Sequence, residues 1–175
     1  MIRDLLDANR IRAGEGIPLN ISDCSLGDIL RNVTREMADL HGNRFQLNLG
    51  GQDATGNWDA RAVQRVVENL IGNAVKYGTS GAIVTLGFEQ TASWVDLFVH
   101  NEGNPVPETE LETLFIPYRR TDSANSSGQK GWGLGLTLVK GIAEAHGGSA
   151  RAESSAEKGT TFFVRLPKSV PEGLH

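Results

Sequence analysis

Three long stretches of the chain repeat their hydrophobic positions every three or four residues, which is the spacing of a helix with one buried face. They predict helices from Ser25 to His41, from Asp59 through Val75 and from Thr137 to His146. Ser25 and Asp59 are typical N-cap residues and are placed at the starts of the first two. Shorter helices are expected over residues 1–13 and 107–115.

Between the helices, apolar and polar residues alternate, which is typical of half-buried strands. The pattern predicts strands over residues 45–49, 82–88, 95–99 and 159–166, with weaker signals at 19–21 and 150–152. Strands and helices alternate too irregularly for a doubly wound parallel sheet. We therefore expect an α+β fold, a two-layer α/β sandwich with a mixed, mostly antiparallel sheet and helices on one face.

Composition narrows the class of protein. The chain has 175 residues, enough for one domain with a core, and its net charge of −4 provides no basic surface for nucleic acid or for an acidic membrane. Its single cysteine, Cys24, fits a reducing compartment, and we find no signal peptide or membrane-spanning run. We expect a cytoplasmic protein with no direct membrane contact and a disordered tail over residues 169–175.

A glycine-rich stretch, Gly131-Trp132-Gly133-Leu134-Gly135-Leu136, immediately precedes the third long helix. Glycines at alternate positions suit neither a helix nor a strand, but they allow the backbone to approach another group closely. The start of a helix presents unpaired N–H groups and the positive end of a dipole, which favours a phosphate. Taken alone, the stretch fits an ordinary glycine-rich surface loop equally well.

The second long helix carries a separate polar stripe formed by Asn69, Asn73 and Lys76. Asparagine is unfavourable inside a helix because its side chain competes for backbone hydrogen bonds. A row of amide oxygens and an ammonium group is suited to a metal–phosphate group, because Mg²⁺ prefers oxygen ligands and keeps several waters. The alternative is a solvated polar face without a ligand.

Five segments together resemble the ATP-binding catalytic domain of bacterial sensor histidine kinases, a branch of the gyrase, heat-shock ATPase and MutL superfamily. They are NLIGNAVKY (69–77), HNEGNPVP (100–107), LFIPYRR (114–120), GWGLGLTLVKGIAEAHGG (131–148) and GTTF (159–162). The resemblance implies the Bergerat fold, with the catalytic domain over residues 18–168. Residues 1–17 are similar to the end of the dimerisation helix and its linker.

The resemblance also implies roles for individual residues. Asn73 would bind Mg²⁺ with help from Asn69, Lys76 would contact the phosphates, and Arg120 would donate to the γ-phosphate of ATP. The catalytic residues would be Asn69, Lys76 and Arg120, and residues 117–130 would form a lid. The implied nucleotide-binding set is Asn69, Asn73, Lys76, Tyr77, Asn101, Gly103, Pro105, Val106, Arg120, Gly131, Trp132, Gly133, Leu134, Gly135, Leu136 and Thr160.

The chain departs from the family pattern at three positions. Asn101 replaces the aspartate that reads adenine, so its amide oxygen can accept the adenine amino group only without charge assistance. Pro105 replaces a glycine and stiffens the turn, and Trp132 replaces a small residue. Bacterial phytochrome-type kinases resemble this chain in their HNxG variant.

None of the four histidines lies in a phosphoacceptor motif. His41 and His146 are placed at helix C-termini, where a cation complements the helix dipole. We therefore expect a fragment that binds Mg-ATP and donates the γ-phosphate to a histidine on a dimerisation domain outside this chain, with a response-regulator receiver domain as the later partner. Asn69 occupies the place of the water-activating glutamate of gyrase-like relatives, so transfer is expected to prevail over hydrolysis.

Two alternatives remain. A gyrase-like ATPase would need a general-base glutamate at position 69 and further domains. A degenerate module of the same fold, which no longer binds ATP and acts through protein–protein contacts, would be consistent with Asn101 and Pro105. Nucleotide affinity separates this last alternative from a kinase.

Overall fold

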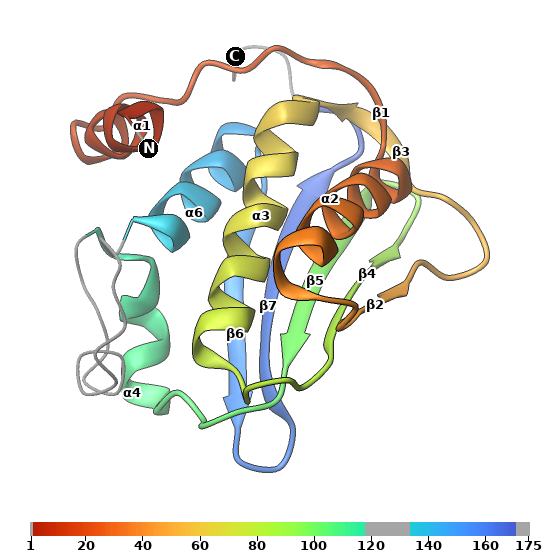
Figure 1. Cartoon of the computed structure of the whole chain (residues 1–175). Helices are drawn as coiled ribbons and strands as arrows, with labels where there is room; N and C mark the ends of the chain where they lie inside the picture. Colours follow the sequence, from red (N-terminus) through yellow and green to blue (C-terminus); the bar gives the residue numbers. More distant parts are fainter. Residues whose placement is uncertain (1, 118–133, 171–175) are drawn as a thin grey trace.

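The structure, a computed structural model, describes residues 2–117 and 134–170, and its helices and strands follow in an irregular order (Figure 1). The helices are α1 (Ile2–Arg12), α2 (Leu26–His41), α3 (Ala60–Tyr77), α4 (Glu108–Leu111), a 3-10 helix (Glu112–Phe115) and α6 (Gly135–Ala145). The strands are β1 (Ser22–Ser25), β2 (Phe45–Asn48), β3 (Thr55–Trp58), β4 (Val84–Gln90), β5 (Trp94–Asn101), β6 (Ser149–Ser155) and β7 (Gly159–Pro167).

Five strands form the main sheet in the order β2-β4-β5-β7-β6. Only β2 and β4 pair in parallel, and the other three pairs are antiparallel. Helices α2, α3 and α6 cover one face of this sheet (Figure 1). The predicted two-layer α/β sandwich with a mixed, mostly antiparallel sheet is confirmed.

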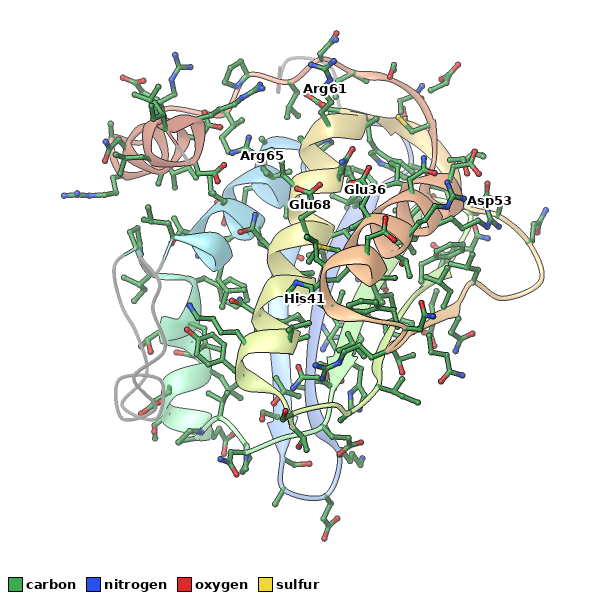
Figure 2. All side chains as sticks on the ribbon, viewed as in Figure 1. Glu36, His41, Asp53, Arg61, Arg65 and Glu68 are labelled. Atoms are coloured by element: carbon green, nitrogen blue, oxygen red, sulfur yellow. The ribbon has the colours of Figure 1, made fainter. Side chains whose placement is uncertain are left out.

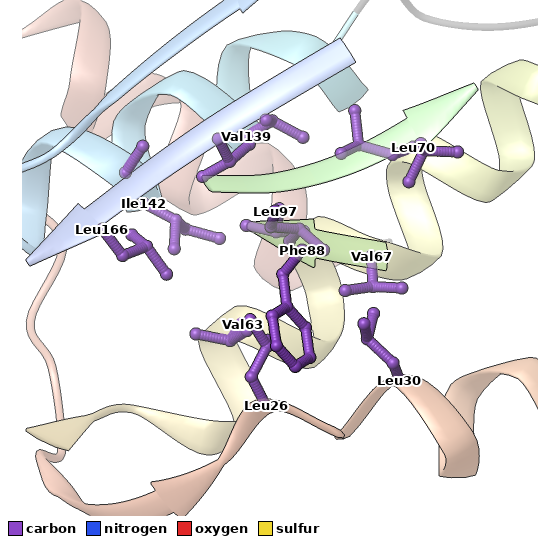
Figure 3. Packing of buried hydrophobic residues seen from close by; sticks show 14 of the residues in the cluster. Leu26, Leu30, Val63, Val67, Leu70, Phe88, Leu97, Val139, Ile142 and Leu166 are labelled. Carbon is purple, nitrogen blue, oxygen red and sulfur yellow. The ribbon is translucent and has the colours of Figure 1, made fainter. Parts of the chain in front are cut away.

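The hydrophobic core lies between the three helices and the covered face of the sheet (Figure 3). Helices α2, α3 and α6 and strands β4, β5 and β7 contribute the apolar positions that their periodicity predicts. Burying each large aliphatic side chain stabilises the fold by about 1.5–3 kcal/mol. The labelled core residues are Leu26, Leu30, Val63, Val67, Leu70, Phe88, Leu97, Val139, Ile142 and Leu166.

The predicted helix caps are present. The Ser25 hydroxyl accepts a hydrogen bond from the backbone N–H of Asp28 at 3.1 Å, and the Asp59 carboxylate accepts one from Ala62 at 3.0 Å. The third long helix, α6, begins at Gly135, two residues before the predicted start. Its first turn therefore includes the end of the glycine-rich stretch.

The strand predicted at residues 19–21 is wrong. The strand here is β1, three residues later, and it pairs with β3 in a small antiparallel sheet. Strand β3 was not predicted because its residues, TGNW, show no apolar alternation. Its position follows from Trp58, which is completely buried and donates a hydrogen bond from Nε1 to the Pro167 carbonyl at 2.7 Å.

The expected disordered tail begins too early. Ser169 forms a parallel bridge with Asn57, and Val170 is buried in the core. The ordered chain therefore continues through residue 170, and the rest of the expected tail, 171–175, lies outside the described residues. In the described part of the chain, no helix combines the length and the apolar character that crossing a membrane requires.

Candidate functional site

The polar stripe of α3 is half-buried, and its first residue, Asn69, lies next to the start of α6. Asn69 donates from Nδ2 to the Arg65 carbonyl one turn earlier, at 2.8 Å. This bond uses the nitrogen end of the amide and leaves Oδ1 as the acceptor end. The unfavourable mid-helix asparagine thus presents an oxygen on the stripe that also contains Asn73 and Lys76.

The start of α6 lies directly against this stripe. A Cβ atom added at Gly135 would be 2.9 Å from Asn69 Oδ1, so a side chain at position 135 would displace the amide. The N-cap residue, Leu134, makes no side-chain capping bond to the first turn. Because the first amides of a helix have no partner within the helix, this end remains suited to an anion.

A second part of the site surrounds Asn101, the last residue of β5. Asn101 is 7% exposed and donates from Nδ2 to the Glu102 carbonyl at 3.2 Å, which leaves Oδ1 as its acceptor atom. A Cβ at Gly78 would lie 2.9 Å from Asn101 Nδ2. Gly103 has φ +154°, and a Cβ added there would lie 3.0 Å from the Gly78 Cα. The turn after β5 therefore packs against the C-terminal end of α3 through glycines.

Thr160 lies beside Asn101 on the adjacent strand. Its hydroxyl is 2.7 Å from the Ser154 hydroxyl, which also accepts a hydrogen bond from the Val106 N–H at 2.8 Å. Ser154 was missed by sequence reasoning because it lies on a weak strand, and only the β6–β7 register brings it to Thr160. The three residues connect the turn after β5 to the edge of the sheet.

The structure thus places the described members Asn69, Gly135, Asn101 and Thr160 beside the middle and the C-terminal end of α3. Lys76 Nζ lies 5.4 Å from the centre of the Tyr77 ring, which is 40% exposed. Leu134 and Leu136 are directed toward the packed interior, so only their backbone groups remain as candidates for a ligand. Arg120, Gly131, Trp132, Gly133 and the lid predicted at 117–130, except for its first residue, lie outside the described residues.

The prediction that His146 acts as a helix-terminal cation is wrong. His146 is completely buried; its Nδ1 bonds the Ile142 carbonyl at 2.7 Å and its Nε2 bonds the Asp59 N–H at 3.1 Å. A carbonyl only accepts and an N–H only donates, so the ring is the neutral tautomer with the proton on Nδ1. Burial lowers the pKa of His146, in agreement with this assignment. His146 instead ties the end of α6 to the start of α3.

No group of three or more His, Cys, Asp or Glu side chains suited to a metal occurs among the described residues. The candidate donors are instead amide oxygens on a helix beside a glycine-lined helix start. Residues 58–170 match the model of the histidine kinase-, DNA gyrase B- and HSP90-like ATPases. The chain belongs to this family.

Relatives within the family are sensor kinases. The probable sensor kinase SilS of Salmonella typhimurium is 33% identical over 129 residues, which cover 72% of this chain and 26% of that protein. The sensor protein CzcS of Cupriavidus metallidurans is 32% identical over 151 residues, covering 86% of this chain and 32% of that protein. The chain therefore spans about a third or less of the length of these curated relatives.

Solved structures agree. The catalytic domain of histidine kinase ThkA superposes with a TM-score of 0.73 and 26% identity, covering 86% of this chain and 99% of that domain. The unit described here is the ATP-binding catalytic domain of a sensor histidine kinase.

Proposed function

We propose that this chain binds Mg-ATP at the C-terminal end of α3 and donates the γ-phosphate to a histidine on a dimerisation domain. The observation that carries the proposal is the close approach of Gly135 to Asn69, where an added Cβ would lie 2.9 Å from Asn69 Oδ1. This contact sets a row of amide oxygens against the unpaired start of α6, which is the combination that a metal-bound phosphate requires.

The residues present fit the nucleotide. Asn73 lies one turn beyond Asn69 on the same half-buried stripe and would provide the protein ligand to Mg²⁺, and Lys76 would hold the phosphates. Asn101 would accept the adenine amino group through Oδ1, with Thr160 in the network beside it. When bound, Mg-ATP supplies the phosphoryl group, and the role of the chain is to position it and balance its charge. Arg120 and Gly131–Gly133 complete the proposed set.

The acceptor histidine belongs to another domain in this proposal. His146 is buried, and both of its ring nitrogens are hydrogen-bonded. His100 lies near the end of β5, where its Nδ1 is 2.7 Å from the Thr161 hydroxyl. Position 69 holds an amide rather than a carboxylate, so the chain lacks a general base there and transfer prevails over hydrolysis. Residues 1–17 would be the end of the dimerisation helix and its linker, and residues 18–168 the catalytic domain. A response-regulator receiver domain would then take the phosphoryl group in the cytoplasm.

Calorimetric titration with a non-hydrolysable ATP analogue, with and without Mg²⁺, tests the proposal. We expect saturable, Mg²⁺-dependent binding that Asn73→Ala weakens at least tenfold. Asn32→Ala is the matched control, because Asn32 is also a mid-helix asparagine but is exposed on α2. Equal weakening by both substitutions would contradict the assigned role of Asn73. No binding by the unchanged chain at millimolar nucleotide would favour the degenerate, partner-binding module.

A further inference from the structure

Helix α1 is seated on the catalytic unit by an ion-pair cluster at Arg65 of α3. Arg65 Nη2 lies 2.6 Å from Asp4 Oδ1, and Nη1 lies 2.8 Å from Asp7 Oδ2. The side chains of Arg65 and Asp7 are only 17% and 12% exposed. Arg65 lies on the side of α3 toward α1 and α6 (Figure 2). Such partly buried, forked contacts hold a more defined geometry than exposed surface pairs.

An apolar contact with α6 also holds α1 in place. A Cβ added at Gly141 would overlap the Ile11 side chain, and Ile17 lies against the same position. Ala8 is fully buried and Ile17 is 6% exposed. Ile11 therefore packs closely on α6 at Gly141, and α1 contacts both helices that carry the candidate nucleotide site.

We propose that Arg65 is a clamp that seats α1 across α3 and α6, and that seating of α1 and nucleotide binding are coupled. Arg65 lies one turn before Asn69, whose amide is bonded to the Arg65 carbonyl. Gly141 lies on the helix whose first residue, Gly135, contacts Asn69. A ligand that sets the spacing of α3 and α6 at the site also sets the seat of α1, and by linkage the seat affects the ligand equally. The coupling rests on the proposed nucleotide binding, whereas the clamp itself does not.

Hydrogen exchange of the α1 amides directly measures how stably α1 is docked on α3 and α6. An isolated helix of 11 residues is marginal in water, so these amides are protected only while α1 is docked. In the complete chain without nucleotide, we expect Arg65→Gln and the double substitution Asp4→Asn with Asp7→Asn each to speed α1 exchange at least tenfold. Arg61→Gln, an exposed arginine one turn earlier on α3, is the matched control and should leave α1 exchange unchanged.

Charge reversal distinguishes the ion pairs from a general loss of structure. Arg65→Asp alone should release α1, and its combination with Asp4→Arg and Asp7→Arg should restore much of the protection. Exchange of α1 that is the same in Arg65→Gln and in the unchanged chain would overturn the clamp, as would equal effects of Arg65→Gln and Arg61→Gln.

The coupling is tested by adding a non-hydrolysable ATP analogue with Mg²⁺. We expect saturating nucleotide to slow α1 exchange several-fold in the unchanged chain, and Arg65→Asp, which releases α1, to weaken nucleotide affinity by up to the same factor. Exchange of α1 that is insensitive to bound nucleotide would overturn the coupling. A chain that binds no nucleotide at all would overturn the proposed function and the coupling together, while the comparison of Arg65→Gln with Arg61→Gln still decides the clamp.

Discussion

The two ends of α3 are held in opposite ways. At the N-terminal end, side chains make the connections: Asp59 caps the helix, the His146 ring bonds the Asp59 N–H, and Arg65 pairs with α1. At the C-terminal end, Gly78 and Gly103 allow direct approach of backbone segments.

This difference separates a structural end from the proposed binding end. Specific side-chain hydrogen bonds satisfy the polar groups of the first end and leave them nothing further to bind. Glycine contacts use few donors or acceptors, and the amides of Asn69 and Asn101 bond through Nδ2, which leaves their oxygens as acceptors. Substitutions of Asp59 or His146 at the first end should change stability alone, whereas those at the second end should change nucleotide affinity.

The largest expected effect is at the N-terminal end. His146→Ala removes two buried hydrogen bonds and leaves a cavity, so we expect the free energy of unfolding to fall by about 2–4 kcal/mol. Urea denaturation measures this loss. His41→Ala is the matched control, because His41 also ends a helix but is exposed, and it should change stability by less than ~0.5 kcal/mol. A tenfold loss of nucleotide affinity in folded His146→Ala protein would show that the two ends are not separable.

A methyl group added at Gly159, beside Asn101, should lower both the stability and the nucleotide affinity. Gly159 has φ +71°, and a Cβ there would overlap the Asn101 carbonyl oxygen. Gly81 has nearly the same backbone angle, φ +74°, with nothing within 4 Å, so Gly81→Ala reports the backbone strain alone, about 1 kcal/mol. We expect Gly159→Ala to cost about 1–2 kcal/mol more in urea denaturation and to weaken nucleotide binding. Equal losses for the two variants would show that the close approach to Asn101 has no energetic importance.

Moderately acidic pH should lower the stability that His146 contributes at the N-terminal end of α3. Burial lowers the pKa of His146 below its ordinary value of 6.5, so between these two values only the unfolded chain binds the proton. Stability is therefore fully present above pH 6.5 and falls as the pH decreases toward the folded pKa, by at most about 1.4 kcal/mol per pH unit. Denaturation midpoints between pH 7.5 and 5.5 measure this slope. The slope should be smaller in His146→Ala, and an identical slope would contradict the neutral assignment.

The smallest expected effect is on affinity alone. Asn101→Asp restores charge assistance to the adenine acceptor, which adds about 1 kcal/mol and tightens nucleotide binding several-fold. Asn104→Asp adds the same charge at an exposed neighbour and is the control for long-range electrostatics. Titration calorimetry measures both variants. Weaker binding by Asn101→Asp would mean that the bond from Asn101 Nδ2 to the Glu102 carbonyl matters more than a charge at the acceptor.

Local pattern was sufficient for much of this molecule. The caps at Ser25 and Asp59, the apolar stripe of α3 and the alternation along β5 and β7 each reflect interactions within a few residues, and all are confirmed. Strand β3 could not be predicted in this way, because it is held by pairing with β1 and by the burial of Trp58 against a distant segment.

The sequence by itself determined the fold class, the family and the polar stripe of α3, because periodicity, caps and motif spacing are properties of neighbouring residues. Only the tertiary structure decided that His146 is a neutral buried tie rather than a cation, since its charge depends on the distant Asp59 and on the absence of water. The same holds for the contact between Asn69 and Gly135 and for the pairing of Arg65 with α1, which join segments remote in the chain. Desolvation and long-range contact have no local signature, and they distinguish the structural end of α3 from its candidate binding end.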